Sequence, residues 1–167
     1  IVLSHVARNV AVSGGTIKYC KTGIAINQAS NRITLNGVRI QTNEESGTGG
    51  SGGWHEGTME YVQGDYIANS HFVDIFGCNF EPTKTAWQRM VYIIDSTDIN
   101  IKSCTVKANN TCIYALSASD ITIEDNRLEI GSNPGGTNKG FVTVESTYAL
   151  CDKITIRRNT MVGSVAA

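Results

Sequence analysis

The sequence predicts an all-β fold, a stacked parallel β-solenoid of about five to six coils that occupies residues 1–167 as one domain. A ten-residue pattern recurs along the chain: two polar positions, then apolar, polar, apolar, two polar, a small residue or Asn, polar and apolar. Six segments follow it, namely 8–17, 31–40, 71–80, 97–106, 119–128 and 152–161. The 17 glycines, the two prolines and the many Ile, Val and Thr residues favour β-structure. Short β-rich repeats cannot bury their apolar side alone, so they must stack on one another.

A further strand precedes the ten-residue pattern in each repeat. In four repeats it opens nine residues before the first apolar position of the pattern, at Ile24, Gly64, Met90 and Cys112. A further copy starts at Phe141 and contains four extra residues before Ile154. One repeat is therefore expected to comprise a strand, a short polar turn, a second strand, a tight turn, a short third strand and a loop.

The eighth position of the pattern is predicted to form a structural column at the tight turn, where Asn bonds the backbone and the amide of its neighbour. Its members are Gly15, Val38, Cys78, Cys104, Asn126 and Asn159. Cys78 and Cys104 are adjacent in this column, as a stacked pair of thiols or as a disulfide. The five cysteines are an odd number without CxxC spacing, which favours buried free thiols over a zinc site or a disulfide framework.

The long insertions all follow the third strand of a repeat. They cover 18–23, 41–63, 81–89, 107–111 and 129–140, and those at 41–63, 81–89 and 129–140 are expected to protrude. Insertions on one side of a solenoid usually mark its working side. On the opposite part of the repeat, Lys102, Glu124 and Arg157 alternate in sign and are interpreted as a solvated ladder of ion pairs.

Three short strands per coil, a tight turn with an Asn column and a variable loop after the third strand resemble the right-handed parallel β-helix of the pectate lyase-like superfamily, which includes bacteriophage tailspikes. The phrase VSGGTI at 12–17 resembles phage β-helix proteins more than plant-wall enzymes. The resemblance implies a tailspike or tail-fibre segment in a virion tail or outside the cell, with a saccharide groove on the loop side. Polygalacturonase-type NTD, DD, GHG and RIK motifs and the WIDH run of pectate lyases are absent, so no catalytic residue transfers.

The strand after the loops is apolar on both faces. Met90, Tyr92 and Ile94 alternate with Val91 and Ile93, and the next repeat follows with Ile113. A solvent-facing strand should alternate with polar residues, so another subunit is the expected cover. Phage tailspikes are trimers, and the resemblance therefore implies a homotrimer through the sheet that bears Val91, Ile93 and Ile113.

The loops contain the candidate saccharide-binding residues. The flexible run 46–53 leads to Trp54, His55 and Glu56, interpreted as an arm with an aromatic plate for a sugar ring. The alternative is a disordered loop whose Trp packs against the rod. Trp87 and Arg89 are candidates in the next loop, and core packing is the alternative for Trp87.

Asp95 and Glu81 are the candidate pair for glycoside hydrolysis, with Asp65 as a third carboxylate, because hydrolysis needs two carboxyl groups about 5–10 Å apart. Asp95 and Asp98 also flank the turn into Ile99, where Asp often caps the backbone. A lyase would instead need a base and a group that neutralises the uronate carboxylate. Hydrolase, lyase and absence of catalysis remain open alternatives.

The composition also limits the partners. The net charge of −1 gives no positive electrostatic field that would favour nucleic acid binding. The sequence contains no apolar run of 18 residues, so no membrane insertion is expected. No cofactor or metal is expected. The chain starts at Ile1 without a signal peptide, so a fragment or a processed chain is expected. Two functions result: a tailspike-like β-helix that binds and depolymerises a bacterial surface polysaccharide, or a non-catalytic rod or receptor-binding segment that grips a host glycan.

Overall fold

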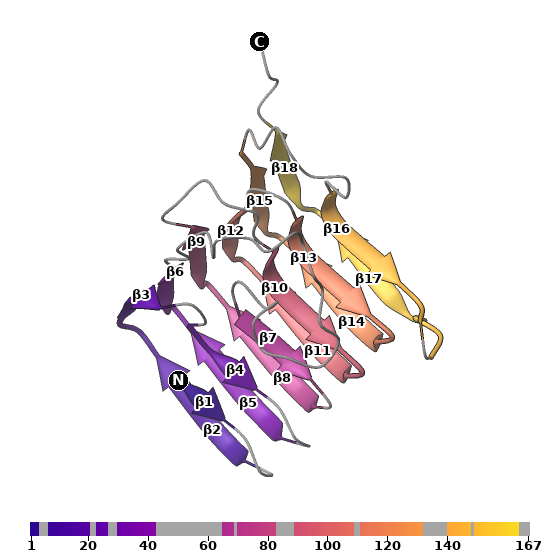
Figure 1. The fold of residues 1–167 in the computed structure, drawn as a ribbon, viewed down its shortest axis with the longest axis horizontal. Helices are drawn as coiled ribbons and strands as arrows, with labels where there is room; N and C mark the ends of the chain where they lie inside the picture. Colours follow the sequence, from indigo (N-terminus) through magenta and orange to yellow (C-terminus); the bar gives the residue numbers. More distant parts are fainter. Residues whose placement is uncertain are drawn as a thin grey trace, which may run out of the picture.

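The computed structural model describes residues 1–3, 7–20, 23–26, 30–42, 65–68, 70–82, 89–108, 111–131, 140–147 and 149–163. In this part of the chain, strands form three six-stranded sheets and no helix is present. Every strand pair is parallel, and the strands of one sheet are stacked side by side along the molecule (Figure 1).

The three sheets, here named A, B and C, take every third strand of the chain. Sheet A contains β1 (Val2–Leu3), β4 (Ala25–Ile26), β7 (Asp65–Ala68), β10 (Arg89–Ile94), β13 (Thr111–Leu116) and β16 (Gly140–Glu145). Sheet B contains β2 (Arg8–Ser13), β5 (Asn31–Asn36), β8 (His71–Phe76), β11 (Thr97–Lys102), β14 (Ser119–Glu124) and β17 (Ile154–Arg157). Sheet C contains β3 (Thr16–Cys20), β6 (Arg39–Thr42), β9 (Asn79–Pro82), β12 (Thr105–Ala108), β15 (Arg127–Ile130) and β18 (Thr160–Gly163). This order is consistent with the predicted parallel β-solenoid.

The apolar positions of the ten-residue pattern face the interior, as the alternation predicted. Ile99 pairs with Val73 on one side and Ile121 on the other, and all three side chains are fully buried. Their neighbours Ile101 and Ile123 repeat this arrangement two residues later. Because full burial of one Ile side chain contributes about 1.5–3 kcal/mol, these columns are a main source of stability.

The tight turn between sheets B and C contains the predicted structural column. Asn126 accepts a hydrogen bond from the backbone N–H of Cys104 at 2.9 Å and donates one to the carbonyl of Ile101 at 2.9 Å. Asn159 makes the equivalent bonds one repeat later. Cys78 and Cys104 are free thiols, so the stacked pair and not the disulfide is observed.

The turn from sheet A into sheet B has a conformation that the sequence did not reveal. In each repeat, the residue just before the first inward apolar residue of sheet B has a left-handed backbone, with φ between 50° and 58°. These residues are Asn9, Arg32, Phe72, Asp98, Asp120 and Lys153. The same turn contains buried serines, and the Oγ of Ser96 accepts from the backbone N–H of Ser70 at 3.1 Å.

The inner and outer faces of sheet A are the reverse of those expected. Val91, Ile93 and Ile113 face the interior of the solenoid, and Tyr92 and Tyr114 lie on the outer face. The two tyrosine rings meet edge to face at 5.0 Å and are only 5% and 4% exposed. The chain itself therefore buries much of the apolar outer face, and the homotrimer stays a prediction.

The charge ladder on sheet B is confirmed, with exposed cations around a carboxylate that is itself buried. Glu124 lies 2.8 Å from Lys102 and 2.5 Å from Arg157, and its side chain is only 7% exposed. Arg158, in the turn to sheet C, adds a contact of 3.1 Å to the same carboxylate. Three cations surround Glu124 and shield it from water.

Candidate functional site

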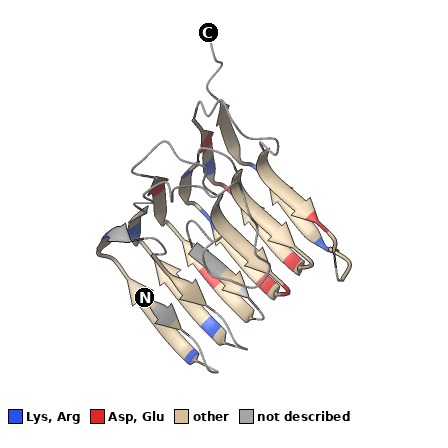
Figure 2. Ribbon diagram, viewed as in Figure 1, with Lys and Arg blue, Asp and Glu red and all other residues tan. Residues whose placement is uncertain are grey.

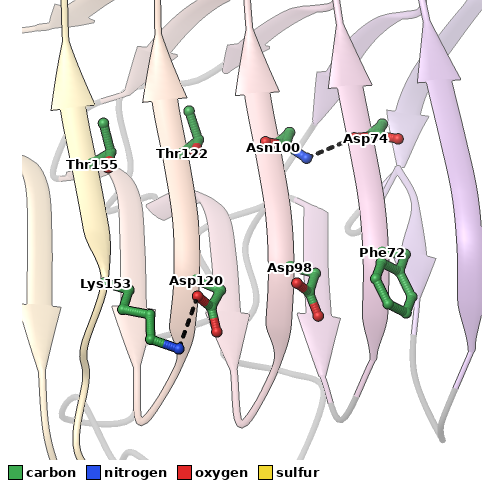
Figure 3. Close-up of a pocket in the computed structure, with 8 residues that line it drawn as sticks. All are labelled: Phe72, Asp74, Asp98, Asn100, Asp120, Thr122, Lys153 and Thr155. Carbon is green, nitrogen blue, oxygen red and sulfur yellow. Dashed lines mark hydrogen bonds and ion pairs between the residues drawn. The ribbon is translucent and has the colours of Figure 1, made fainter.

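A depression of about 440 Å³ lies on the outer face of sheet B. Its lining forms two rows that cross the strands (Figure 3). The first row consists of Phe72, Asp98, Asp120 and Lys153, and the second of Asp74, Asn100, Thr122 and Thr155. Because neighbouring strands lie about 4.8 Å apart, a row that crosses four strands is about 14 Å long. We refer to this depression as the sheet B groove.

Strand alternation explains why these side chains point outward. In β11 the residues Ile99 and Ile101 face the core, so Asp98, Asn100 and Lys102 face the solvent. The second row holds only short side chains. The next outward position holds the longer Lys102, Glu124 and Arg157, which rise beside the shorter row. This difference in side-chain length creates the depression.

Hydrogen bonds hold the polar groups of the groove in place. Asn100 Nδ2 donates to Asp74 Oδ1 at 2.8 Å, and Lys153 Nζ lies 3.4 Å from Asp120 Oδ1. Thr97 Oγ1 donates to Asp98 Oδ2 at 3.0 Å. The three carboxylates are thus oriented by an amide, an ammonium and a hydroxyl group.

Thr97 also connects Asp98 to a histidine. His71 Nδ1 lies 2.7 Å from Thr97 Oγ1. The single hydroxyl proton of Thr97 goes to Asp98, so His71 Nδ1 must be the donor to Thr97. This assigns the proton of a neutral His71 to Nδ1 and leaves Nε2 as an acceptor.

Phe72 is the unusual residue of the groove. Its side chain is 55% exposed, and its backbone is left-handed, with φ of 55°. This conformation is favourable for Gly and tolerated by Asn and Asp, but it costs about 1–2 kcal/mol for other residues. An exposed aromatic ring recovers little of that cost through burial.

The groove carries a negative formal charge. It contains three aspartates and one lysine, which give a net charge of −2. Among the described residues, only Asp120 of the three aspartates forms a salt bridge. Figure 2 shows acidic segments on the middle strands of the stack and basic segments on β2 and β5.

Most of the residues expected to bind saccharide lie outside the described part of the chain. Trp54, His55, Glu56 and Trp87 lie outside the described residues. Arg89 opens β10 and Asp65 opens β7, but their side chains lie outside the described part. These assignments stay predictions.

The structure does not bring Asp95 and Glu81 together. Asp95 lies in the turn between β10 and β11, where its backbone N–H donates to the carbonyl of Leu116. Glu81 lies in β9 of sheet C, at the other end of sheet A (Figure 1). The six residues of β10 between these two corners extend about 20 Å, which is well beyond the separation of a hydrolytic pair.

Glu81 belongs instead to an ion-pair network on sheet C. Arg39 Nη2 donates to Glu81 Oε2 at 2.9 Å, Gln41 Nε2 donates to it at 3.2 Å, and Lys107 Nζ lies 3.8 Å from Oε1. The hydrogen bond from Arg39 holds the pKa of Glu81 below its ordinary value. A carboxyl group that gives up its proton so readily is unsuited to act as a general acid.

The sequence contained one signal for the groove. Phe72 occupies an outward position whose equivalents in the other repeats are all polar or charged. The sequence predicts for Asp98 only a turn cap, because a capping Asp and a ligand-binding Asp look alike in sequence.

No family model, curated protein or solved structure matches the chain. Within the described residues, no group of three or more His, Cys, Asp or Glu side chains is placed to hold a metal ion. The same part of the chain contains no helix with the length and hydropathy needed to cross a membrane.

Proposed function

We propose that this protein binds a saccharide chain in the sheet B groove. Phe72 is the observation that carries the proposal: a bulky residue is kept in an unfavourable backbone conformation while more than half of its side chain is exposed. The turn imposes this backbone in every repeat, but Phe72 is the bulky apolar residue at a position that is otherwise polar or charged. An exposed ring at the end of a polar groove offers a flat apolar surface for the C–H face of a sugar.

The polar residues of the groove supply the complementary chemistry. Asp98 and Asp74 offer carboxylate acceptors, and Thr122 and Thr155 offer hydroxyl groups. Sugar hydroxyls both donate and accept, so they can bond to each of these groups. A row about 14 Å long fits an extended chain of several sugar units along the stack better than a single small molecule.

The repeat pattern supports a more specific reading of the fold and the ligand. We take the solenoid as a right-handed parallel β-helix of about five to six coils, because parallel crossover connections are almost always right-handed. The resemblance to phage tailspikes favours a bacterial surface polysaccharide as the ligand and a location in a virion tail or outside the cell.

Hydrolysis of the bound chain is a second candidate function, favoured by the position of two aspartates. Thr97 pairs with Ser119 and Ile99 with Ile121, so Asp98 lies level with Asp120 on the neighbouring strand. Adjacent strands are about 4.8 Å apart, close to the 5–5.5 Å that separate the two carboxyl groups of retaining glycosidases. One residue would act as acid and the other as nucleophile.

Binding is tested with a broad panel of capsular and O-antigen polysaccharides immobilised on a sensor surface. The wild type is compared with Phe72→Asn, which keeps a residue that tolerates a left-handed backbone and removes the ring. We expect at least about tenfold weaker binding of Phe72→Asn, since loss of one aromatic contact often costs more than 1 kcal/mol. Equal binding by both proteins, or no binding to any polysaccharide, would reject the proposal.

Hydrolysis is tested separately on the polysaccharides that bind. New reducing ends that disappear in both Asp98→Asn and Asp120→Asn support the carboxylate pair. A rise of absorbance near 232 nm without loss in these variants indicates elimination at another site. If neither signal appears while binding persists, the protein is a non-catalytic binding module.

A further inference from the structure

We propose that the sheet B groove selects glycans without acidic groups, that is, neutral or amine-bearing saccharides, and rejects those that contain uronic or other acidic sugars. This inference rests on the proposed saccharide-binding function and specifies its ligand class. The charges that line the groove carry it.

The carboxylates are spread along the groove and not gathered at one end. Asp74, Asp98 and Asp120 come from the three successive strands β8, β11 and β14 (Figure 3). A chain that lies along the two rows therefore meets a carboxylate at nearly every strand. At a separation of about 5 Å, a sugar carboxylate and one of these groups repel each other even when water screens them partly.

Among the described residues, no cation that could neutralise an acidic sugar lies in the middle of the groove. Lys153, the one cation of this part of the chain that lines the groove, lies at its far end and pairs with Asp120. Asp74 and Asp98 accept hydrogen bonds only from the neutral groups of Asn100 and Thr97 in the described contacts. Neither of these two carboxylates therefore has a cation beside it in the described contacts.

The charged groups around the groove do not reverse this field. On one side, Lys102 and Arg157 pair with the buried Glu124. Beyond Phe72 the same row continues to Arg32 on β5, which does not line the groove. His71 on β8 donates through Nδ1 to Thr97 and faces Asp98 only through that hydroxyl.

The charge also separates two possible chemistries. Elimination from a uronate needs a group that neutralises the sugar carboxylate next to the abstracted proton. The three aspartates of the groove are acidic groups like the sugar carboxylate, so they cannot neutralise it. Hydrolysis of a neutral glycosidic bond has no such requirement, so the groove favours hydrolysis over elimination if the bound chain is cleaved.

The experiment uses the full chain on an array of neutral, amine-bearing and acidic oligosaccharides. The strongest binder is then compared with its own derivative oxidised at the C6 hydroxyl, which adds a carboxylate and leaves the backbone of the sugar unchanged. We expect the glycans that bind to be neutral or amine-bearing. The oxidised derivative should bind at least about tenfold more weakly than its parent. A strongest binder that is acidic, or an oxidised derivative that binds equally well, would overturn the inference.

A matched pair of variants assigns the effect to the groove. Asp74→Asn/Asp98→Asn removes two charges and keeps the shape and the left-handed backbone at position 98. This variant should bind the oxidised derivative at least about tenfold more tightly than the wild type does. Asp95→Asn makes the same chemical change at an exposed left-handed residue outside the groove and should leave the ratio unchanged. Failure of every glycan to bind rejects the proposed function itself, whereas binding without charge discrimination rejects only this inference.

Discussion

Phe72 and Asp98 lie level with each other on the neighbouring strands β8 and β11, and both have a left-handed backbone, with φ of 55° and 58°. The turn from sheet A to sheet B imposes this conformation in every repeat, whatever the side chain is. Asp tolerates it because its short polar side chain bonds locally, but Phe does not. Of these two groove residues, Asp98 suits the turn and Phe72 is present at a cost.

Phe72→Asn is expected to stabilise the protein by about 1 kcal/mol, because Asn relieves the left-handed strain and little buried area is lost. Urea unfolding followed by circular dichroism measures this change. Val73→Ala, which truncates the buried neighbour, serves as the opposite control and should destabilise by about 1–3 kcal/mol. Loss of stability in Phe72→Asn would mean that the ring is a packing residue and would weaken the functional argument.

Asn126→Ala should destabilise the protein by about 3 kcal/mol, because it leaves the buried N–H of Cys104 and the buried carbonyl of Ile101 without their partner. Asn159→Ala removes equivalent bonds at a less buried position in the last repeat. Its unfolding free energy should therefore fall by less. Equal losses in the two variants would show that burial does not set the value of this column.

Acid should destabilise the fold through its ion-paired carboxylates. Hydrogen bonds from Lys102 and Arg157 hold the pKa of Glu124 below its ordinary value, and a hydrogen bond from Arg158 does the same for Asp125. A lowered folded-state pKa contributes stability that is fully present above the unfolded pKa, about 4.3 for Glu, and is lost as the pH falls toward the folded pKa.

Thermal melts between pH 6 and pH 2.5 measure this loss. The melting temperature should fall as the pH drops below about 4.3, and Glu124→Gln should make that fall shallower. A wild-type melting temperature that stays constant over this range would contradict the assignment.

The thiols should differ in reactivity. Burial raises the pKa of Cys112 to about 12, and the hydrogen bond with Cys78, together with burial, raises the pKa of Cys104. Cys151 is only half-buried. Iodoacetamide at pH 8 should therefore label Cys151 well before Cys112, since only about one in 10⁴ molecules carries a thiolate at a pKa four units above the pH. Peptide mass mapping checks this order, and equal labelling of both sites in the folded protein would contradict it.

The homotrimer predicted for sheet A has to use Ile94 and Leu116, which lie half-buried on its outer face, because Val91, Ile93 and Ile113 point inward. Light scattering should then give the mass of three chains, and Ile94→Asp should reduce it to one. Leu150→Asp, at an exposed position outside the sheet, is the control and should leave the mass unchanged. If the wild type is a monomer at micromolar concentration, the predicted homotrimer is wrong.

The alternation of polar and apolar residues was enough to predict the strands, the inward columns such as Ile99 and Ile121, and the Asn126 corner. These features depend on residues a few positions apart in sequence and on a pattern that occurs six times in the chain. The charge ladder was recognised for the same reason, although the burial of Glu124 was not, because Arg158 reaches it from the turn of the next repeat and not from the ladder column.

The residues of the candidate site could not be predicted in the same way. Asp95 and Glu81 were paired on the assumption that loops and the following strand lie on one side, but a full strand of sheet A separates their corners. The sheet B groove brings together Phe72, Asp98 and Lys153 from segments up to 81 residues apart in sequence.

The amino-acid sequence by itself determined the class of fold, because burial of alternate residues in a repeated strand leaves stacking as the only way to exclude water. Only the tertiary structure decided which outward residues form a site. That choice depends on the register between strands and on the left-handed turn that aims Phe72 and Asp98 into one groove, and neither can be inferred from the order of residues along a single repeat.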